Sequence, residues 1–260
     1  MDNLKIYKKQ KDHKTIVKVK DVTFNDGSFN LIAGPCSIES YESLDKTAGI
    51  ISKNGGKLIR GGTFKLRTSP YSFEGLGKEA IDYLHKIGKK YNLITVSEIP
   101  SILELTMFIE KIDIIQVGAR NMNNFPLLKA LGKTKKPVIL KRGSQSTIEE
   151  WLLAAEHILN EGNDQIILCE RGSRSFETYT RNTLDLSAAL AAKKLTHLPV
   201  IIDPSHGTGR ADMVSDFTKV AKFMKFDGAL IEIHENPETA LSDGFQTIDF
   251  DEYEELVASL

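Results

Sequence analysis

The sequence has few cysteines, no long apolar run and no excess of either charge, and each absence argues against a class of protein. Its 260 residues include two cysteines, Cys36 and Cys169, which lie far apart and form no CxxC pair. That spacing argues against a disulfide scaffold and fits a reducing compartment. No run approaches the roughly 20 apolar residues that cross a bilayer, and the charged start lacks the apolar core of a signal peptide. We therefore expect a cytoplasmic protein that does not enter a membrane.

The overall charge gives no sign of a polyanionic partner. Lys and Arg number 34 against 35 Asp and Glu, a formal net charge of −1. Nucleic acid and anionic membranes are therefore not expected as partners, and any anion must be bound by a local cluster of cations. The 41% of hydrophobic residues is enough for a large core, and the length lies within the range of a TIM barrel.

Eight short runs rich in Ile and Val recur along the chain, each followed by a turn and an amphipathic segment. Runs that are apolar on both faces are typical of buried parallel strands. They are LIAGPC (31–36), KLIRGG (57–62), LITVSE (93–98), DIIQVG (113–118), PVILKR (137–142), QIILCE (165–170), PVIID (199–203) and GALIEI (228–233). Eight β-α units without a linker predict a catalytic (β/α)8 TIM barrel over residues 30–260, with no separate regulatory domain. An open α/β sheet is the alternative.

Local signals support this division. Thr147 followed by Glu150 predicts a capping box at the start of the helix WLLAAEHIL. Residues 1–29 form an extension in which IVKV alternates and VTF precedes an Asn-Asp-Gly turn at 25–27, which predicts a β-hairpin. Such a hairpin would plug the bottom of the barrel. A frayed tail is the alternative for residues 1–14.

Reactive side chains gather at the ends of the predicted strands. Active sites of TIM barrels lie at the C-terminal ends of the strands. The residues at or just beyond these ends are Cys36, Arg60, Lys65, Arg67, Glu98, Arg120, Lys141, Arg142, Glu170, Arg171, Asp203, His206, Glu232 and His234, with Asp243 in the last loop. Any one of them could be a charge in a solvated loop. The agreement of all eight strand ends favours an active site.

The cations among them predict the class of substrate. They are Arg60, Lys65, Arg67, Arg120, Lys141, Arg171 and, further along, Arg210. Guanidinium groups bind carboxylate and phosphate oxygens in a bidentate manner. On a chain of nearly zero net charge, such a cluster would repel itself without a bound anion. We therefore expect substrates that are small, phosphorylated and polyanionic.

A second group contains the side chains that bind divalent metals. Cys36, His206, Glu232 and Asp243 supply a thiolate, an imidazole and two carboxylates, a set suited to Mn, Fe, Co or Zn. Because they would come from three strands and the last loop, their spacing along the chain does not test the site. A packed apolar role is the alternative for Cys36, but its place at a strand end favours a ligand. Cys169 lies inside an apolar run and is predicted to be core.

Seven motifs occur in the order and spacing of one known family. They are IAGPCS (32–37), RGGTFKLRTSPYSFEGLG (60–77), IIQVGARN (114–121), LKRG (140–143), CERG (169–172), DPSHGTGR (203–210), and IEIH with ALSDG (231–234 and 240–244). Over roughly residues 30–250 the chain resembles the short-type 3-deoxy-7-phosphoheptulonate (DAHP) synthases, which are related to 3-deoxy-octulosonate 8-phosphate synthase.

The resemblance implies a fold, a reaction and a set of residues. It implies a TIM barrel, usually a homotetramer, that joins phosphoenolpyruvate to erythrose 4-phosphate and releases phosphate, the first step of the shikimate pathway. The cofactor would be Mn2+, with Fe2+, Co2+ or Zn2+ as alternatives. The implied metal ligands are Cys36, His206, Glu232 and Asp243, and the implied phosphoenolpyruvate residues are Arg60, Lys65, Arg120, Lys141 and Arg171. Lys65, Arg67 and Thr68, with Ser69 close by, would meet the aldose phosphate. Glu98 and Asp203 would be polar neighbours of the substrates, and Lys65, His206 and Glu232 the catalytic groups.

Two departures and three alternatives remain. Many relatives carry an added regulatory or chorismate mutase domain, for which this sequence has no room. The family's loop normally reads Lys-Pro-Arg-Thr, and here Leu66 replaces the proline, which frees φ and adds a backbone N–H. We expect weaker aldose binding or an altered aldose specificity. The nearest alternative is 3-deoxy-octulosonate 8-phosphate synthase, which uses arabinose 5-phosphate, but the loop KLRTSPYSF resembles the erythrose-phosphate enzymes. A sialic acid synthase-like enzyme would normally carry an antifreeze-like domain. A non-catalytic homologue would have lost a ligand or a phosphate-binding Arg, and none is lost.

Overall fold

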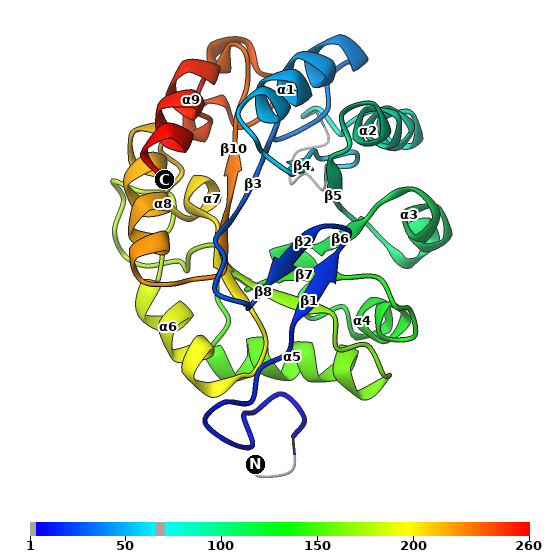
Figure 1. Cartoon of the computed structure of the whole chain (residues 1–260), viewed down its shortest axis with the longest axis vertical. Helices are drawn as coiled ribbons and strands as arrows, with labels where there is room; N and C mark the ends of the chain where they lie inside the picture. The colour runs from blue at the N-terminus through cyan, green and yellow to red at the C-terminus, as the bar shows by residue number, and fades with distance from the viewer. Residues whose placement is uncertain (1–3, 66–70) are drawn as a thin grey trace.

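The computed structural model describes residues 4–65 and 71–260 and shows a ring of parallel strands surrounded by helices (Figure 1). The barrel strands are β3 (Asn30–Gly34), β4 (Leu58–Arg60), β5 (Ile94–Glu98), β6 (Ile114–Val117), β7 (Val138–Lys141), β8 (Ile166–Glu170), β9 (Val200–Ile202) and β10 (Gly228–Glu232). Each pairs in parallel with the next, and β10 pairs with β3, so the sheet closes. The predicted (β/α)8 barrel is confirmed, and the open sheet is wrong.

The strands coincide with the eight predicted runs to within one or two residues, and six of them end before their run does. Cys36 lies two residues beyond β3, because Pro35 has no N–H with which to continue the ladder. Asp203 follows β9 directly, and it caps the N-terminus of the short helix α7 (Pro204–Thr208). Both side chains therefore sit on the turns that leave the strands, at the end of the barrel where the polar residues gather.

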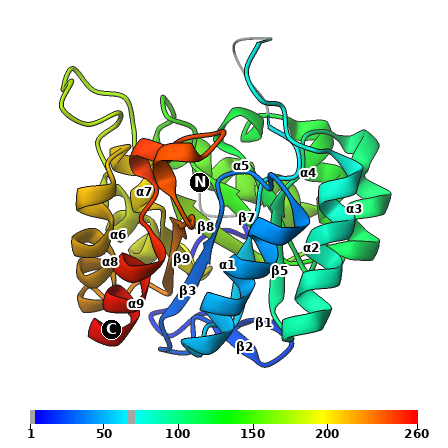
Figure 2. The ribbon, with the colours of Figure 1, turned by 90° about the horizontal axis from the view of Figure 1, so that it is seen from above.

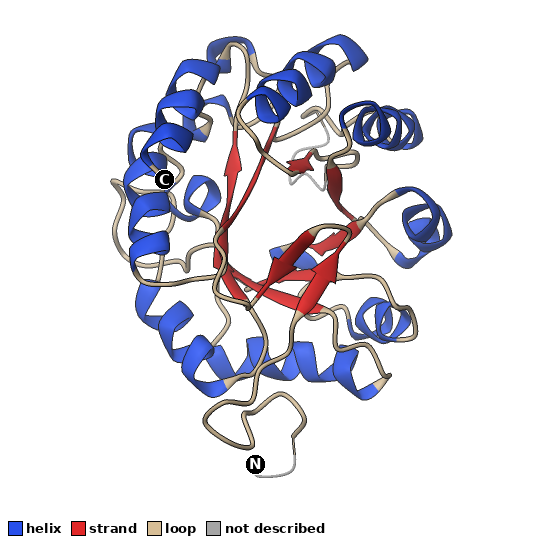
Figure 3. Ribbon diagram, in the orientation of Figure 1, coloured by secondary structure: helices blue, strands red, loops and turns tan. Residues whose placement is uncertain are grey.

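The helices pack outside the ring (Figure 3). They are α1 (Tyr41–Lys53), α2 (Lys78–Tyr91), α3 (Leu105–Lys111), α4 (Phe125–Gly132), α5 (Ile148–Asn160), α6 (Leu186–Leu195), α7 (Pro204–Thr208), α8 (Val214–Phe223) and α9 (Phe250–Ser259), with 3-10 turns η1 (Ile102–Glu104), η2 (Ala119–Asn121), η3 (Ala211–Met213), η4 (Pro237–Thr239) and η5 (Gly244–Gln246). The capping box of Thr147 and Glu150 starts α5 as predicted. Trp151 on α5 is fully buried and donates to Leu140 O at 3.1 Å, which fastens α5 to β7. In the described part of the chain, no helix is both long and apolar enough to cross a bilayer.

A two-stranded hairpin closes the bottom of the barrel. Strands β1 (Val17–Val19) and β2 (Val22–Phe24) pair antiparallel, and their turn is at Lys20, where φ is 52°, rather than at residues 25–27. The hairpin prediction is confirmed, and the Asn-Asp-Gly turn follows the second strand. Its buried side chains share one apolar cluster with inward residues of the barrel strands, among them Ile32, Ile139 and Leu230. Figure 2 shows it beneath the ring of strands.

The segment before the hairpin is also held in place. Ile6 is fully buried, and its backbone N–H donates to Glu156 of α5 at 2.8 Å. Its carbonyl accepts from Thr196 Oγ1 at 2.8 Å. His197 accepts or donates at both ring nitrogens, toward Thr15 Oγ1 and Lys5 O. The frayed-tail alternative is therefore wrong for residues 4–14.

Candidate active site

The inward-facing positions of the strands change from apolar to polar along the barrel. Ile139, Cys169 and Leu230 belong to the interior apolar cluster. Because side chains alternate along a strand, the residues two positions later face the same way. Those residues are Lys141, Arg171 and Glu232. The strands that make an apolar core at one end thus make a charged site at the other.

A pocket of about 300 Å³ opens at this end. Predicted residues that line it are Arg60, Lys65, Glu98, Arg120, Lys141, Arg171, His206 and Asp243. Residues that the sequence analysis missed are Ser144, Arg174, Arg181 and Asn182. Seven lining residues are Lys or Arg and two are carboxylates, so the described wall is strongly cationic and suits a small polyanion.

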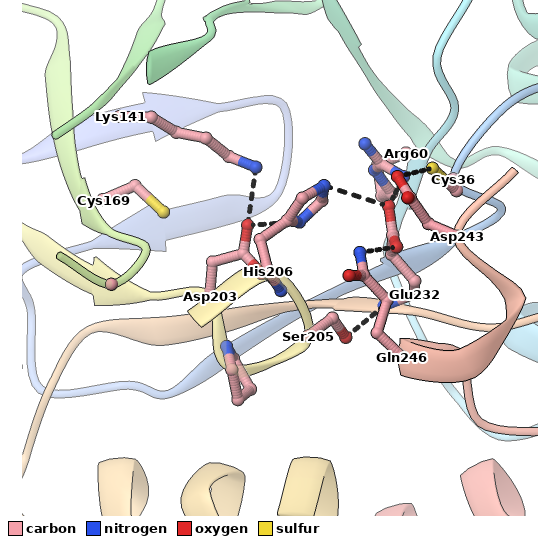
Figure 4. Close-up of polar contacts among 12 residues, drawn as sticks. Cys36, Arg60, Lys141, Cys169, Asp203, Ser205, His206, Glu232, Asp243 and Gln246 are labelled. Carbon is pink, nitrogen blue, oxygen red and sulfur yellow. Dashed lines mark hydrogen bonds and ion pairs between the residues drawn. The ribbon is translucent and has the colours of Figure 1, made fainter. Parts of the chain in front are cut away.

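The predicted metal ligands lie together beside this pocket (Figure 4). The ligand atoms of Cys36, His206, Glu232 and Asp243 all lie within 4.8 Å of one another. Cys36 Sγ donates to Asp243 Oδ2 at 3.2 Å, and His206 Nε2 lies 3.4 Å from Glu232 Oε1. One thiol, one imidazole and two carboxylates at this spacing form a donor set that fits a divalent transition metal.

Asp203 orients His206 toward the cluster. Its carboxylate accepts from the backbone N–H of His206 at 2.9 Å, which caps α7, and its Oδ2 lies 2.8 Å from His206 Nδ1. The tautomer that this carboxylate favours has its proton on Nδ1, which leaves the lone pair of Nε2 for the cluster. Burial alone would raise the pKa of Asp203, but His206 and Lys141, whose Nζ is 2.6 Å away, hold that pKa well below its usual range. Asp203 is thus an ionised group beneath the pocket.

The buried ligands are balanced by pocket cations. Arg60 Nη1 donates to Glu232 Oε1 at 2.9 Å, and Lys65 Nζ lies 3.0 Å from Cys36 Sγ. Burial, with a further contribution from Glu232, raises the pKa of the Cys36 thiol to about 12. Burial would also raise the pKa of Glu232, but His206 and Arg60 hold it below its ordinary value. The carboxylate is therefore ionised, while the thiol must lose a proton to become a ligand.

Gln246 is a buried partner of Glu232 that the sequence analysis missed. Its Nε2 donates to Glu232 Oε2 at 2.6 Å, and its Oε1 accepts from Arg181 Nη1 at 3.3 Å. Gln246 is fully buried in the turn η5, three residues after Asp243. No sequence signal marks it, because a Gln in a loop carries no periodicity or motif of its own.

Glycine makes room for Glu98 at the pocket wall. Gln116 Nε2 donates to Glu98 Oε2 at 2.7 Å. A Cβ on Gly118 would lie 2.1 Å from Glu98 Oε1, so any larger residue there would displace the carboxylate. The short strand β6 and the turn after it therefore hold Glu98 beside the cations.

Several predicted residues lie elsewhere. Arg142, next to Lys141, does not line the described pocket and pairs with buried Glu170 at 3.0 Å. Arg210 does not line this pocket in the described structure: it pairs with Asp212 and its guanidinium lies 4.2 Å from the ring centre of Tyr179. Its place in the cationic rim was therefore wrongly predicted. His234 contacts Asn236 instead of the cluster.

Four residues of the aldose-phosphate loop, Leu66, Arg67, Thr68 and Ser69, lie outside the described residues. The missed cations Arg174 and Arg181 both follow the CERG motif in the loop between β8 and α6. Counting cations beyond each strand end, and not only at it, would have found them.

Comparisons with known proteins agree with this geometry. The model of the DAHP synthetase I family matches residues 9–260. Phospho-2-dehydro-3-deoxyheptonate aldolase of Thermotoga maritima is 49% identical over 246 residues, which make up 95% of this chain and 73% of the relative. A crystal structure of that DAHP synthase superposes with a TM-score of 0.95 at 46% identity, over 98% of this chain and 75% of the other. A 2-dehydro-3-deoxyphosphooctonate aldolase of Desulfotalea psychrophila is 31% identical, over 88% of each chain.

Proposed function

The chain belongs to the DAHP synthetase I family, and we propose that it is a metal-dependent transferase that joins phosphoenolpyruvate to erythrose 4-phosphate. The products are 3-deoxy-D-arabino-heptulosonate 7-phosphate and phosphate, the entry to the shikimate pathway. The observation that carries the proposal is a pocket with a cationic wall, lined also by His206 and Asp243, that adjoins the Cys36, His206, Glu232 and Asp243 cluster. Residues 30–260 form the catalytic barrel, and residues 1–29 its extension.

The cations hold phosphoenolpyruvate. Arg60, Lys65, Arg120, Lys141 and Arg171 all line the pocket, and Arg60 and Lys65 also contact the cluster, so together they can bind both the phosphate and the carboxylate. Fixing both ends of the substrate leaves its C3 directed at the second substrate. Lys65, with Arg67, Thr68 and Ser69 of the following loop, binds the aldose phosphate. Glu98 and Asp203 complete the polar surroundings.

The cluster would hold a divalent metal through Cys36 Sγ, His206 Nε2, Glu232 and Asp243. Bound there, the metal would polarise the aldehyde oxygen of the aldose and make its carbon electrophilic. Mn2+ is the metal that we propose, with Fe2+, Co2+ and Zn2+ as the other ions that this donor set accepts.

The bond changes balance with water as the third reactant. A C–C bond forms between C3 of phosphoenolpyruvate and the aldehyde carbon, and positive charge develops at C2. Water adds at C2, and the C–O bond to phosphate breaks. The fixed cations stabilise the departing phosphate. Lys65 and His206, which face the pocket, and Glu232 beneath it are the groups placed to move protons.

The first test is consumption of phosphoenolpyruvate with erythrose 4-phosphate and, in parallel, with arabinose 5-phosphate. Each reaction is run after EDTA treatment, with and without added Mn2+. Turnover with erythrose 4-phosphate alone, restored by Mn2+, is expected. Turnover only with arabinose 5-phosphate would transfer the assignment to 3-deoxy-octulosonate 8-phosphate synthase. Activity that survives exhaustive chelation would remove the metal roles of the cluster.

The resemblance also leads us to propose a homotetramer. Light scattering coupled to size-exclusion chromatography measures the molar mass directly. A mass four times that of the chain is expected, and a stable monomer would contradict this part of the proposal.

A further inference from the structure

Three of the four cluster side chains pair with a cation that lines the pocket. The pairs are Lys65 Nζ with Cys36 Sγ (3.0 Å), Arg60 Nη1 with Glu232 Oε1 (2.9 Å) and Arg181 Nη1 with Asp243 Oδ1 (3.6 Å). The groups that suit a substrate anion therefore also neutralise the groups that suit a metal. In this arrangement the two sites compete for the same side chains.

Arg181 differs from Arg60 in its freedom to move. Its side chain is 42% exposed, whereas that of Arg60 is 4% exposed and fixed by two hydrogen bonds. The backbone of Arg181 is anchored, because its N–H donates to Thr208 O at 2.8 Å and Gly209 packs against its Cβ. The guanidinium can therefore turn between Asp243 and the pocket while its base stays in place.

Two contacts hold that guanidinium on the cluster side. One is the ion pair with Asp243, and the other is the hydrogen bond to Gln246 Oε1, whose amide in turn donates to Glu232. Arg181 also lines the cationic pocket. A phosphate or carboxylate in the pocket would attract Arg181, and a cation on Asp243 would repel it, by the same charge interactions.

We propose that Arg181 is a further anion-binding residue, and that its exchange between Asp243 and the substrate anion couples anion binding to metal binding. This inference rests on the proposed function, since it takes a phosphorylated carboxylate as the anion and the cluster as the metal site. It assigns a role to a residue that lies on the β8–α6 loop, away from the strand ends.

The sign of the coupling follows from the competition. Each ligand binding alone must break the Arg181–Asp243 pair, and the second ligand finds it already broken. Anion and metal therefore each raise the affinity for the other by the same factor. A partly exposed pair of this kind corresponds to a factor of up to about five.

Calorimetric titration of Mn2+ into the metal-stripped full chain tests the proposal. Titrations are run with and without saturating phosphoenolpyruvate, with no aldose present, on the wild type and on Arg181→Gln. In the variant, Mn2+ is expected to bind up to about fivefold more tightly without the anion, and the gain from adding the anion is expected to shrink by a similar factor. A residue that only supports the loop would weaken Mn2+ binding when replaced and leave the coupling unchanged.

Two further variants keep the result interpretable. Arg210→Gln removes a nearby cation that pairs with Asp212 outside the pocket, and it should reproduce the wild type in every titration. Arg181→Lys keeps the charge and should retain part of the coupling, which guards against a folding defect in the Gln variant. Full coupling in Arg181→Gln, or weaker Mn2+ binding in it, would overturn the proposal.

The two proposals fail in different ways. If the wild type neither turns over nor binds phosphoenolpyruvate, the proposed function fails, and the same titrations with inorganic phosphate still test Arg181, since phosphate presents the same oxygens. If the wild type turns over but Mn2+ and the anion bind independently, the proposed function stands and the role of Arg181 falls.

Discussion

The two ends of the barrel use the same strands for opposite purposes. At the bottom, inward residues such as Ile139 and Leu230 meet Val17 and Phe24 of the hairpin in an apolar cluster. At the top, one inward position further along, Lys141 and Glu232 are buried charges that pair with Asp203 and Arg60. The bottom end is stabilised by apolar burial, whereas the top end holds charges that need partners in a low-dielectric setting.

The difference indicates that folding stability and catalytic chemistry depend on opposite ends of the barrel. Burying paired charges contributes little to stability compared with packed apolar residues of similar size. The plugged end can therefore supply stability that the charged end does not. Substitutions at the two ends should consequently affect different measurements.

The largest effect is expected at the top. His206→Ala removes the imidazole that Asp203 orients into the cluster, and kcat should fall by about a thousandfold or more, because polarisation of the substrate by a metal contributes several kcal/mol. Steady-state kinetics with saturating Mn2+ and a Mn2+ titration measure it. His157→Ala, on the outer helix α5, is the matched control and should leave both quantities unchanged. Wild-type Mn2+ affinity in His206→Ala would remove His206 from the ligand set.

The second effect is expected at the bottom and on stability alone. Phe24 is fully buried in the plug, and Phe24→Ala should lower the free energy of unfolding by about 3–5 kcal/mol. Urea denaturation measures this loss, while kcat at 25 °C should stay near the wild-type value. Ile16→Ala, just before the partner strand β1 but at a position that is 38% exposed, should cost far less. A large drop in kcat for Phe24→Ala in the folded enzyme would show that the two ends are not separable.

The smallest effect is expected on the pH dependence of stability at the bottom of the barrel. Burial lowers the pKa of His197, which bonds Thr15 Oγ1 and Lys5 O near the plug. A histidine whose pKa is lower in the folded state stabilises fully above its unfolded value of about 6.5, and this contribution is lost as the pH falls through its folded pKa. His197→Gln should therefore flatten the decline of the melting temperature below pH 6.5. Parallel melting curves for variant and wild type across that range would contradict this.

The sequence predicts the position of a residue well when that residue lies in a barrel strand or at its end. Continuous Ile and Val runs mark the barrel strands, and the strand-end rule places Arg60, Lys141 and Glu232 where the structure has them. The strands of the predicted hairpin also pair as expected, but the turn that joins them is at Lys20, whose positive φ is rare for its residue type and is marked by no local pattern.

The positions of loop residues cannot be predicted from the strand pattern. Arg181 reaches the pocket because its backbone is fastened to Thr208, and Gln246 reaches Glu232 because η5 folds under the cluster. Both depend on contacts between segments far apart in the chain. The prediction for Arg210 was wrong for the opposite reason: its guanidinium pairs with Asp212, a close neighbour in the sequence, and so does not reach the pocket.

The hairpin has a consequence for how the chain folds. Its strands are synthesised before any barrel strand, yet Val17 and Phe24 share their cluster with Ile201 and Leu230 from near the other end of the chain. Contacts between such distant segments form late, because closing a long loop costs conformational entropy before any contact compensates it. A segment that is synthesised before every barrel strand is thus among the last to reach its native place, and until then its apolar face needs protection from other chains.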